Sequence, residues 1–521
     1  MTFRTAPRRT RLRTTALATA LISLPMAPAM SAANAYAAEV PAPAFTQKLD
    51  TAPSGKARFT FIPSDRDGVT LVDVHYTVKG APEGRQSLRM QRQPDGSWVL
   101  EGPPAGSDFV YHYTFGDNRL VKDTGEFDRA GKPKDGTPTD PGTPTDPPAG
   151  ATFPLNLVNH SGRPDSEVYV TVVGQASPGH YSYLRPDGKL TPVDKADGVY
   201  RKGDRTFPKL SFPLSETTEQ RLTVPAHLQG ARVYVSFGNP MYMGVPNGDS
   251  GYQQPDLNNP SDPNKGTRFD FYEFTYEHGK VAFGGNTTQV DGFSIPLTAE
   301  LKQDQRKYNR TVGITQPAAQ VINGYQKQVG AAFKGLAAND RITAPRSSAD
   351  FRAGGKYSTY FNKVVDEAWN QWKKGFHIKP AAGIEFKGKV QSDGKLHFSK
   401  NNGAPSVLNK PSTADIVACD GALANSAMTQ DAKDLGAHIC AAFNRGVALR
   451  TIDGGKTYNW SEPATYYPKG GTFNDYAAYF HKVNHDHLAY GFAYDDVHDQ
   501  SSVTILPNFD APTSLTLTIG K

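Results

Sequence analysis

Hydrophobic and polar residues alternate along most of this chain, which predicts a mainly β protein. Before residue 131, short alternating segments separated by turn sequences such as Pro94-Asp95-Gly96 are typical of a β-sandwich. These segments are 57–62, 71–79, 86–92, 97–101 and 109–115, with a last one near residue 125. Alternation resumes from residue 151 to about 300, and strand-like sequence returns from about residue 472.

Helical periodicity replaces this alternation in the middle of the chain. Residues 317–336, 357–372 and 432–443 place apolar side chains at helical spacing. We interpret these stripes, including Trp369 and Trp372, as core and not as sugar-binding surfaces. We therefore infer a barrel, residues 151–300 and 471–521, interrupted by an α/β insert at 301–470.

Two segments are predicted to lie outside the folded units. Residues 1–37 combine arginines, an apolar run from about Ala16 to Met30, and an Ala35-Tyr36-Ala37 cleavage sequence, so we expect a signal peptide and a secreted, extracellular protein. The Arg8-Arg9 pair leaves Sec and twin-arginine export both open. Residues 131–150 contain a duplicated Gly-Thr-Pro-Thr-Asp-Pro and predict a semi-rigid linker between a module at 38–130 and a larger domain at 151–521.

Charge narrows the choice of partner. The formal net charge of +6 derives from 57 basic and 51 acidic residues, and removing the five leader arginines leaves 52 against 51. A nearly neutral mature chain favours neither nucleic acid nor an anionic membrane. The 24 tyrosines, 27 phenylalanines and 4 tryptophans suit stacking on a neutral sugar polymer. We expect a monomer with no cofactor and no metal.

The two cysteines, Cys419 and Cys440, lie 21 residues apart in the mature chain. In an oxidising compartment a single disulfide is the expected state of such a pair.

Candidate chemistry is concentrated between residues 268 and 297. Period-two alternation points Glu273, Thr275 and Glu277 to one face of a strand, and Asp291 follows on the next segment. Two carboxylates that face one groove are the minimal equipment for hydrolysing a glycosidic bond.

Several motifs resemble a known family. Glu273-Phe274-Thr275 and residues 290–297 (VDGFSIPL) are similar to the EFT…VDGFNxP signature of thaumatin-like proteins, and residues 490–496 (YGFAYDD) are similar to their YAYDD segment. The opening at 153–162, the length and the lack of a cysteine framework resemble one branch most, glycoside hydrolase family 64. The resemblance covers about residues 151–521 and implies a thaumatin-like β-barrel with an α/β subdomain, which together form a wide cleft.

This resemblance implies an inverting endo-β-1,3-glucanase that cleaves curdlan, laminarin or fungal wall glucan into short oligosaccharides. Glu273 is expected to be the general acid, with its pKa raised by burial beside Tyr and Phe, and Asp291 the general base. Inversion requires carboxyl groups about 6.5–9.5 Å apart. Thr275 and Thr288 are expected to bind sugar hydroxyls.

The spacing of the two acids is slightly greater than in the family pattern, so the acid and base roles could be exchanged, and Asp270 and Glu277 are the alternative acids. The competing hypothesis is a non-catalytic thaumatin-like protein that binds β-glucan or acts on cell walls without cutting the polymer.

The N-terminal module resembles carbohydrate-binding module family 56, through residues 72–76, 96–98 and 109–115. We assign Trp98 as a sugar-binding residue, although a place in the core is an equal alternative. Alternation does not decide which side of the 109–115 strand faces solvent.

A cluster of histidines and aspartates near the C-terminus offers a rival metal site. Its members are His481, His485, His487, His498, Asp486, Asp495, Asp496 and Asp499. His481 and His485 have the spacing of an H-E-x-x-H motif, but Lys482 stands where the catalytic Glu would be, so we favour structural and groove-lining roles.

Overall fold

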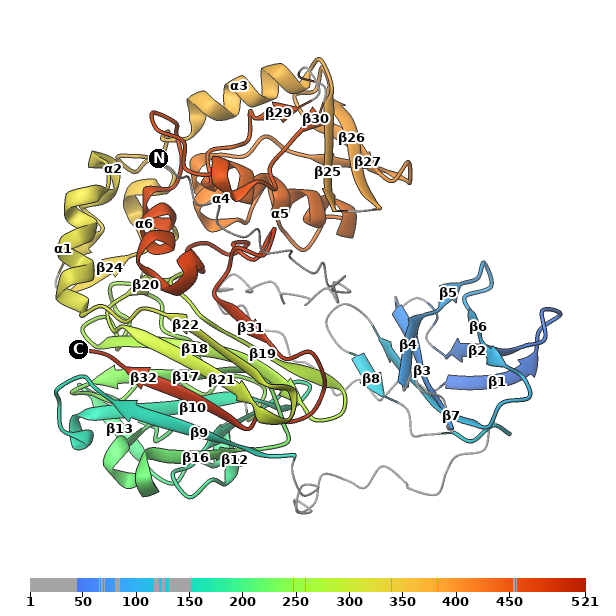
Figure 1. Ribbon diagram of the computed structural model, residues 1–521, viewed down its shortest axis with the longest axis horizontal. Coiled ribbons are helices and arrows are strands. Elements are labelled where there is room, and N and C mark those ends of the chain that lie inside the picture. Colours follow the sequence, from blue (N-terminus) through green and yellow to red (C-terminus); the bar gives the residue numbers. More distant parts are fainter. Residues whose placement is uncertain are drawn as a thin grey trace, which may run out of the picture. The chain divides into compact units, whose positions relative to one another are not determined.

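The structure, a computed structural model, describes residues 45–130 and 151–521 apart from short gaps (Figure 1). The gaps lie at residues 65, 67–68, 70, 80–84, 117–120, 124–126, 247, 258, 339, 382, 453–454 and 456. The predicted signal peptide, the linker and the strand near residue 125 lie outside the described residues. The chain divides into two compact units, Met1–Pro138 and Thr139–Lys521.

The N-terminal unit contains two antiparallel sheets, each of four described strands, in the orders β1-β2-β6-β5 and β4-β3-β7-β8. Their bounds are β1 Phe45–Thr51, β2 Lys56–Pro63, β3 Leu71–Val78, β4 Arg85–Arg89, β5 Gln91–Arg92, β6 Trp98–Pro104, β7 Phe109–Gly116 and β8 Val121–Asp123. Alternate residues of both sheets, such as Phe59, Phe61, Tyr111 and Tyr113, fill one shared core. The tyrosines of the 109–115 strand are therefore the inward-facing set.

Two large sheets form what we call the β lobe of the C-terminal unit. The eight-stranded sheet runs β12-β11-β10-β17-β18-β19-β31, with β15 paired to β10. Its strands are β10 Val168–Ser177, β11 His180–Leu184, β12 Leu190–Pro192, β15 Phe212–Pro213, β17 His227–Phe237, β18 Arg268–Glu277, β19 Val281–Thr287 and β31 Val503–Ile505. The five-stranded sheet runs β16-β9-β32-β21-β22, with strands β9 Phe153–Asn159, β16 Arg221–Val224, β21 Leu297–Gln303, β22 Tyr308–Gly313 and β32 Ser514–Ile519.

One apolar core, which includes Val170 and Val233 from the larger sheet and Ala299 and Leu517 from the smaller, lies between these two sheets. The described strands form two open sheets and not the closed barrel that we predicted. A separate hairpin, β13 Val199–Lys202 with β14 Arg205–Pro208, extends from the β lobe.

The rest of the unit, which we call the mixed lobe, combines helices with a six-stranded sheet of its own (Figure 1). Its helices are α1 Ala318–Gln328, α2 Ala331–Lys334, α3 Asn362–Trp372, α4 Thr413–Ala418, α5 Gln430–Asn444 and α6 Asp475–Val483. Its sheet runs β28-β27-β26-β25-β30-β29, with bounds β25 Phe376–Ala381, β26 Ile384–Val390, β27 Leu396–Lys400, β28 Pro405–Leu408, β29 Thr451–Ile452 and β30 Thr457–Tyr458. A short ladder, β20 Gly292–Phe293, β24 Arg341–Thr343 and β23 Ala337–Ala338, joins the two lobes.

The helical stripes match helices α1 with α2, α3 and α5, and Trp369 and Trp372 are buried in the mixed-lobe core. The predicted limits of the insert, 301 and 470, need correction, because β21 and β22 pair within the β lobe up to Gly313. Sequence after residue 472 is not all strand either, because α6 packs its aromatic face into the mixed-lobe core. Among the described residues, no helix combines the length and apolar character that a membrane crossing requires.

Candidate active site

Strand β18 separates core residues from candidate site residues by simple alternation. Tyr272, Phe274 and Tyr276 point into the core between the two large sheets, as predicted. Glu273 and Thr275 therefore face outward on the opposite side of the strand. Glu273 keeps 36% of its side-chain surface exposed, so the predicted enclosure of this carboxyl group by aromatic rings is not formed.

A buried arginine lies beside Glu273. Arg232 of β17 pairs with Glu273 across the sheet, is 5% exposed, and places Nη2 3.8 Å from Oε1. Its guanidinium donates to Gln254 Oε1 at 2.8 Å and to the Tyr234 hydroxyl at 3.2 Å, and lies over the ring of Phe271. These contacts fix a cation next to the candidate acid.

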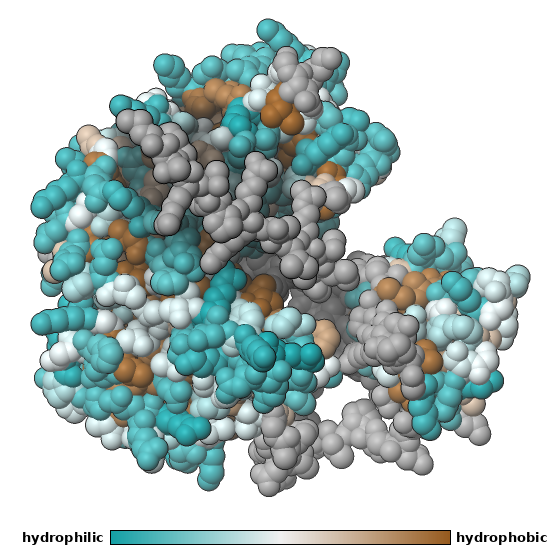
Figure 2. Space-filling model, viewed as in Figure 1, coloured by the Kyte–Doolittle hydropathy of each residue, from teal (hydrophilic) through white to brown (hydrophobic). Residues whose placement is uncertain are grey.

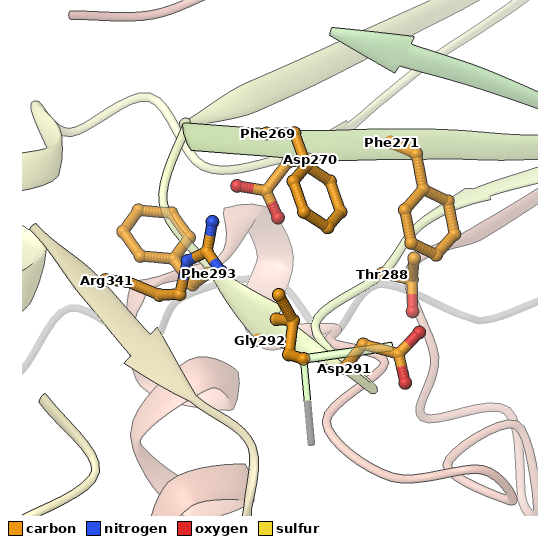
Figure 3. Close-up of a pocket in the computed structure, with 9 residues that line it drawn as sticks. Phe269, Asp270, Phe271, Thr288, Asp291, Gly292, Phe293 and Arg341 are labelled. Atoms are coloured by element: carbon orange, nitrogen blue, oxygen red, sulfur yellow. The ribbon is translucent and has the colours of Figure 1, made fainter. Parts of the chain in front are cut away.

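A pocket beside this strand contains the second candidate acid (Figure 3). The residues that line it are Leu257, Phe269, Asp270, Phe271, Thr288, Asp291, Gly292, Phe293 and Arg341. Figure 3 shows the Thr288 hydroxyl and the Asp291 carboxylate close together below the ring of Phe271, whereas Asp270 lies nearer to Arg341. Glu273 is not part of the lining, but it is two residues beyond Phe271 on the same strand and so occupies the next position on that face.

Asp291 is held where the two lobes meet. It lies in the bend before β20, and its backbone carbonyl accepts a 3.3 Å hydrogen bond from the amide of Ala344. Arg346 places Nε 3.8 Å from the Asp291 Oδ1 atom, and 34% of the Asp291 side-chain surface remains exposed. Both predicted acids are thus partly open to solvent, and each has one arginine nearby.

The alternative acid Asp270 is engaged in holding the fold. It is 9% exposed and accepts hydrogen bonds from the amides of Ser294 and Ile295 and from the Ser294 hydroxyl. Burial raises the pKa of Asp270 to about 7, although these hydrogen bonds oppose the rise. Its lone pairs face the protein's own donors, so we assign it to fixing the turn after β20.

Glu277, the other alternative, is locked in ion pairs. Its carboxylate lies 2.7 Å from Lys280 Nζ and 3.5 Å from His227 Nδ1, and accepts from Gln229 at 3.1 Å. Burial alone would raise the pKa of Glu277, but these partners lower it to about 2. A carboxyl group that stays ionised cannot donate a proton to a leaving group.

The two predicted sugar-binding threonines differ in their contacts. The Thr275 hydroxyl accepts a 2.9 Å bond from the amide of Gly230, at a bulge in the β17–β18 pairing. Thr288 is 8% exposed, accepts from the amide of Val290 at 3.2 Å, and lines the pocket beside Asp291. Binding of sugar by either residue stays a prediction.

Trp98 requires a correction. It is 5% exposed and belongs to the core of the N-terminal unit, so its ring is covered on both faces by protein and cannot serve as a platform for a sugar ring. The proposed sugar-binding role of Trp98 is therefore wrong.

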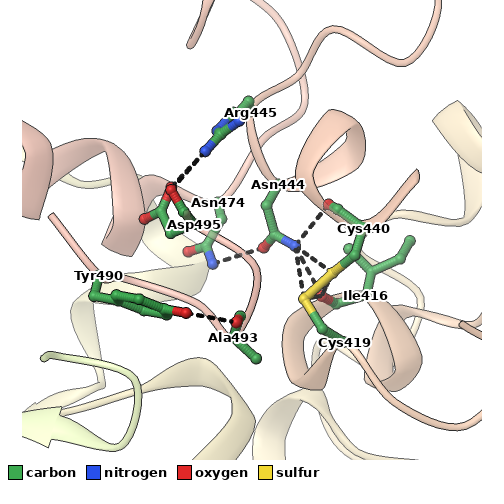
Figure 4. The surroundings of a disulfide bond; sticks show 9 residues. All are labelled: Ile416, Cys419, Cys440, Asn444, Arg445, Asn474, Tyr490, Ala493 and Asp495. Atoms are coloured by element: carbon green, nitrogen blue, oxygen red, sulfur yellow. Dashed lines mark hydrogen bonds and ion pairs between the residues drawn. A yellow bond between two sulfur atoms is a disulfide. The ribbon is translucent and has the colours of Figure 1, made fainter. Parts of the chain in front are cut away.

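Two members of the C-terminal cluster of histidines and aspartates, Asp495 and His481, are engaged in holding the fold. Asp495 is fully buried and accepts from Arg445 Nη2 at 2.9 Å (Figure 4). It also accepts from the amide of Gly491 at 2.9 Å and from His481 Nε2 at 3.0 Å. Burial raises the pKa of Asp495, but the charges and bonds of His481 and Arg445 outweigh burial and hold it below its usual value. Within the described part of the chain, no group of three or more His, Cys, Asp and Glu side chains is arranged to hold a metal ion.

The predicted disulfide is present beside this cluster. Cys419 and Cys440 are bonded, with Cα atoms 5.6 Å apart, and tie the end of α4 to α5 (Figure 4). The amide of Asn444 donates to the carbonyls of Ile416 and Cys440 and so fixes the same junction.

Arg232 and Arg346 are the site residues that sequence reasoning missed. Arg232 lies on β17, the strand that pairs with β18 of Glu273. It is placed beside Glu273 only by the register of these two strands. Arg346 follows Asp291 by 55 residues in a short 3-10 turn of the mixed lobe, and no local motif marks it.

Glycoside hydrolases use a pair of accessible carboxyl groups to cleave the glycosidic bond, and Glu273 and Asp291 are two such groups. The comparison with families makes the class specific: the chain belongs to glycoside hydrolase family 64, described as beta-1,3-glucanase, whose model matches residues 151–519. The model of carbohydrate binding module family 56 matches residues 47–124. Both resemblances noted in the sequence are thereby confirmed.

The individual curated relatives share only about a quarter of their aligned residues with this chain. A glucan endo-1,3-beta-glucosidase from Cellulosimicrobium cellulans is 26% identical over 363 residues, which are 67% of this chain and 62% of that protein. One from an Arthrobacter strain is likewise 26% identical. This chain thus spans about 62% of the length of these curated relatives.

Solved structures agree with the fold. A family 64 β-1,3-glucanase domain from Clostridium beijerinckii is 29% identical, with a TM-score of 0.64, and covers 72% of this chain and all of its own. A laminaripentaose-producing β-1,3-glucanase from Paenibacillus barengoltzii, solved with laminarihexaose, is 26% identical with a TM-score of 0.54, and covers 92% of this chain and all of its own.

Proposed function

We propose that this protein is a secreted endo-β-1,3-glucanase that cleaves β-1,3-glucan into short oligosaccharides by an inverting mechanism. The observation that carries the proposal is the pair Glu273 and Asp291 in a chain of this family, both 34–36% exposed and neither saturated with hydrogen bonds from the protein. Asp270 and Glu277, by contrast, are committed to donors of the protein.

In this mechanism Glu273 protonates the oxygen of the leaving sugar while Asp291 removes a proton from the attacking water. The water approaches the anomeric carbon from the face opposite the departing oxygen, so the configuration inverts. Thr288, beside Asp291 in the pocket, would orient either the water or a sugar hydroxyl. Arg232 would stabilise the negative charge that Glu273 acquires as it loses its proton.

The decisive experiment compares the wild type with Glu273→Gln on curdlan and laminarin. We expect reducing ends from the wild type and a loss of about 10²–10⁴-fold in the variant, the usual contribution of general acid catalysis. Lys302→Gln, on the other large sheet, is a matched surface control that should keep full activity. A wild type that binds curdlan but releases no reducing ends would support the rival, a non-catalytic thaumatin-like binder.

Stereochemistry needs a separate measurement. Proton NMR of the first product from a β-linked glucan should show the α-anomer before mutarotation. A β-anomer would refute inversion while leaving the hydrolase itself intact.

We propose further that the module at residues 47–124 holds the monomeric enzyme on insoluble glucan, by analogy with the carbohydrate-binding family it matches. A chain without residues 38–150 should retain its rate on soluble laminarin and lose rate on curdlan. Equal loss on both substrates would contradict this role. Detection of the protein in the culture medium, with cleavage after Ala37, would test secretion.

A further inference from the structure

The outer face of the eight-stranded sheet continues past Glu273 to the short edge strand β31. Glu273 pairs with Asn286 of β19, and Asn286 pairs with Val503 of β31. In the next row Thr275 pairs with Gly284, which pairs with Ile505. Directly paired residues of neighbouring strands share a face, so both rows lie on the face that carries Glu273.

The intervening row confirms this orientation. Phe274 pairs with Gly285, which pairs with Thr504. Phe274 belongs to the core, and Thr504 is fully buried and directs its hydroxyl to the carbonyl of Gly285. Val503 and Ile505, on either side of Thr504, therefore point outward.

Ile505 is unusual in its exposure. It keeps 43% of its surface open and is one of the few large hydrophobic side chains that are exposed within the described part of the chain. On the face shown in Figure 2, hydrophilic residues cover most of the described surface and hydrophobic residues form small separate patches. Isolated exposed apolar residues are common, and it is the position of Ile505 in the Thr275 row that gives it meaning.

Gly284 is the middle residue of this row and is itself buried. It stands between Thr275 and Ile505 and has no side chain, so nothing rises from the middle strand in this row. At the usual strand spacing, Ile505 lies about 10 Å from Thr275 across two strands. Asn286, partly exposed in the neighbouring row, presents an amide group that can both donate and accept hydrogen bonds.

We propose that Asn286, Val503 and Ile505, here called the edge strip, form an additional subsite for a glucosyl residue of the polymer. The sugar lies with its apolar face on Ile505 and Val503, and its hydroxyls bond to the Asn286 amide. The inference rests on the proposed function, because it takes the substrate chain to run across the sheet from Glu273 toward β31. The strip binds sugar and takes no part in the chemistry.

The test uses the full chain and soluble laminarin. Ile505→Ser should raise KM about fivefold to tenfold, from the apolar contact that is lost, and leave kcat unchanged. Ile505→Trp should lower KM, because an aromatic ring offers a larger surface for stacking. Val407→Ser is the matched control: Val407 is 41% exposed on β28, the edge strand of the mixed-lobe sheet, and its replacement should change neither constant.

A binding measurement separates this proposal from the catalytic one. In the Glu273→Gln background, calorimetric titration with laminarin should give a dissociation constant about fivefold to tenfold higher when Ile505→Ser is added. Unchanged KM and unchanged affinity in the serine variant would overturn the edge strip, and so would an equal effect of Val407→Ser. A wild type that fails to hydrolyse laminarin would overturn the proposed function, and this titration would still decide whether the strip binds glucan.

Discussion

Asp291, which lines the pocket at the junction of the lobes, and Asp495, in the interior of the mixed lobe, show two opposite uses of an aspartate side chain. Asp495 is fully buried, and arginine, histidine and a backbone amide occupy its oxygens at 2.9–3.0 Å. Asp291 is 34% exposed, and its nearest cation, Arg346, lies 3.8 Å away, beyond hydrogen-bonding distance. A carboxylate whose lone pairs are all taken holds a fold in place, and one with open lone pairs can exchange protons with a substrate.

The sharpest test of this contrast is Asp291→Asn. We expect kcat on laminarin to fall about 10²–10⁴-fold, because the amide cannot accept a proton from water. The thermal midpoint should change little, since few contacts of the protein depend on this side chain. Thr298→Val, a substitution within the five-stranded sheet away from the groove, serves as the kinetic control. A variant that retains most of its activity would remove Asp291 from the mechanism.

The converse change is Arg445→Met. Removal of this fully buried guanidinium takes away one of the two charged partners of Asp495 and leaves it only His481 and the amide of Gly491, so the free energy of unfolding should fall by about 3 kcal/mol. Urea denaturation measures the loss. The kcat of the protein that remains folded should equal that of the wild type. A large fall in kcat without loss of stability would place the cluster in the active site.

Removing the disulfide should have a smaller effect. The double variant Cys419→Ser, Cys440→Ser frees a loop with a sequence separation of 21 residues, which in the chain-entropy model costs about 3 kcal/mol. The thermal midpoint of the double variant should be lower than that of the oxidised wild type and equal to that of the reduced wild type. A double variant whose thermal midpoint equals that of the oxidised wild type would show that the bond contributes little.

Acid should destabilise the mixed lobe through His438. Burial lowers the pKa of this imidazole from 6.5 to about 4, while Asp434 opposes the shift and Arg445 and Lys400 reinforce it. Because the unfolded chain takes up the proton first, stability is complete above about pH 6.5 and declines as pH falls toward 4. At pH 4.5 the loss from this group is about 3 kcal/mol.

Comparison with His438→Gln isolates this contribution. Unfolding free energies measured from pH 7 to pH 4.5 should fall less steeply in the variant than in the wild type. His498, whose ring centroid lies 5.4 Å from that of His438, titrates with a pKa lowered by burial to about 3 and supplies part of the remaining slope. Parallel slopes in the two proteins would contradict the assignment.

The smallest expected effect comes from Arg346→Gln. A half-exposed ion pair at 3.8 Å contributes about 0.2–1 kcal/mol, so kcat/KM should fall about twofold to fivefold. Arg352→Gln replaces an exposed arginine of the same segment and is the control, which should leave kcat/KM unchanged.

Much of the site followed from local pattern. The alternation of Tyr272, Phe274 and Tyr276 determines where Glu273 points, because side-chain direction in a strand depends only on sequence parity. The disulfide and the core tryptophans likewise followed from compartment and periodicity. Arg232 and Arg346 could not be found in this way, since their positions depend on strand register and on the path of a distant turn.

Local sequence pattern could not predict that the two large sheets stay open or that Trp98 is buried. Whether two sheets join into a barrel depends on which edge strands meet, and alternation is the same in both cases. Trp98 begins β6, and either orientation of that residue fits the alternation of the strand. Its burial is decided by the opposite sheet, which packs its aromatic residues against it.

The ladder that joins the lobes has a mechanical consequence. Phe293, two residues after Asp291, packs in the mixed-lobe core, whereas Leu297 packs between the large sheets. The chain thus crosses from one core to the other between Phe293 and Leu297, and Asp291 lies just before this crossing. A shift of one lobe against the other would act on this short crossing, so the position of the proposed general base is tied to the packing of both cores.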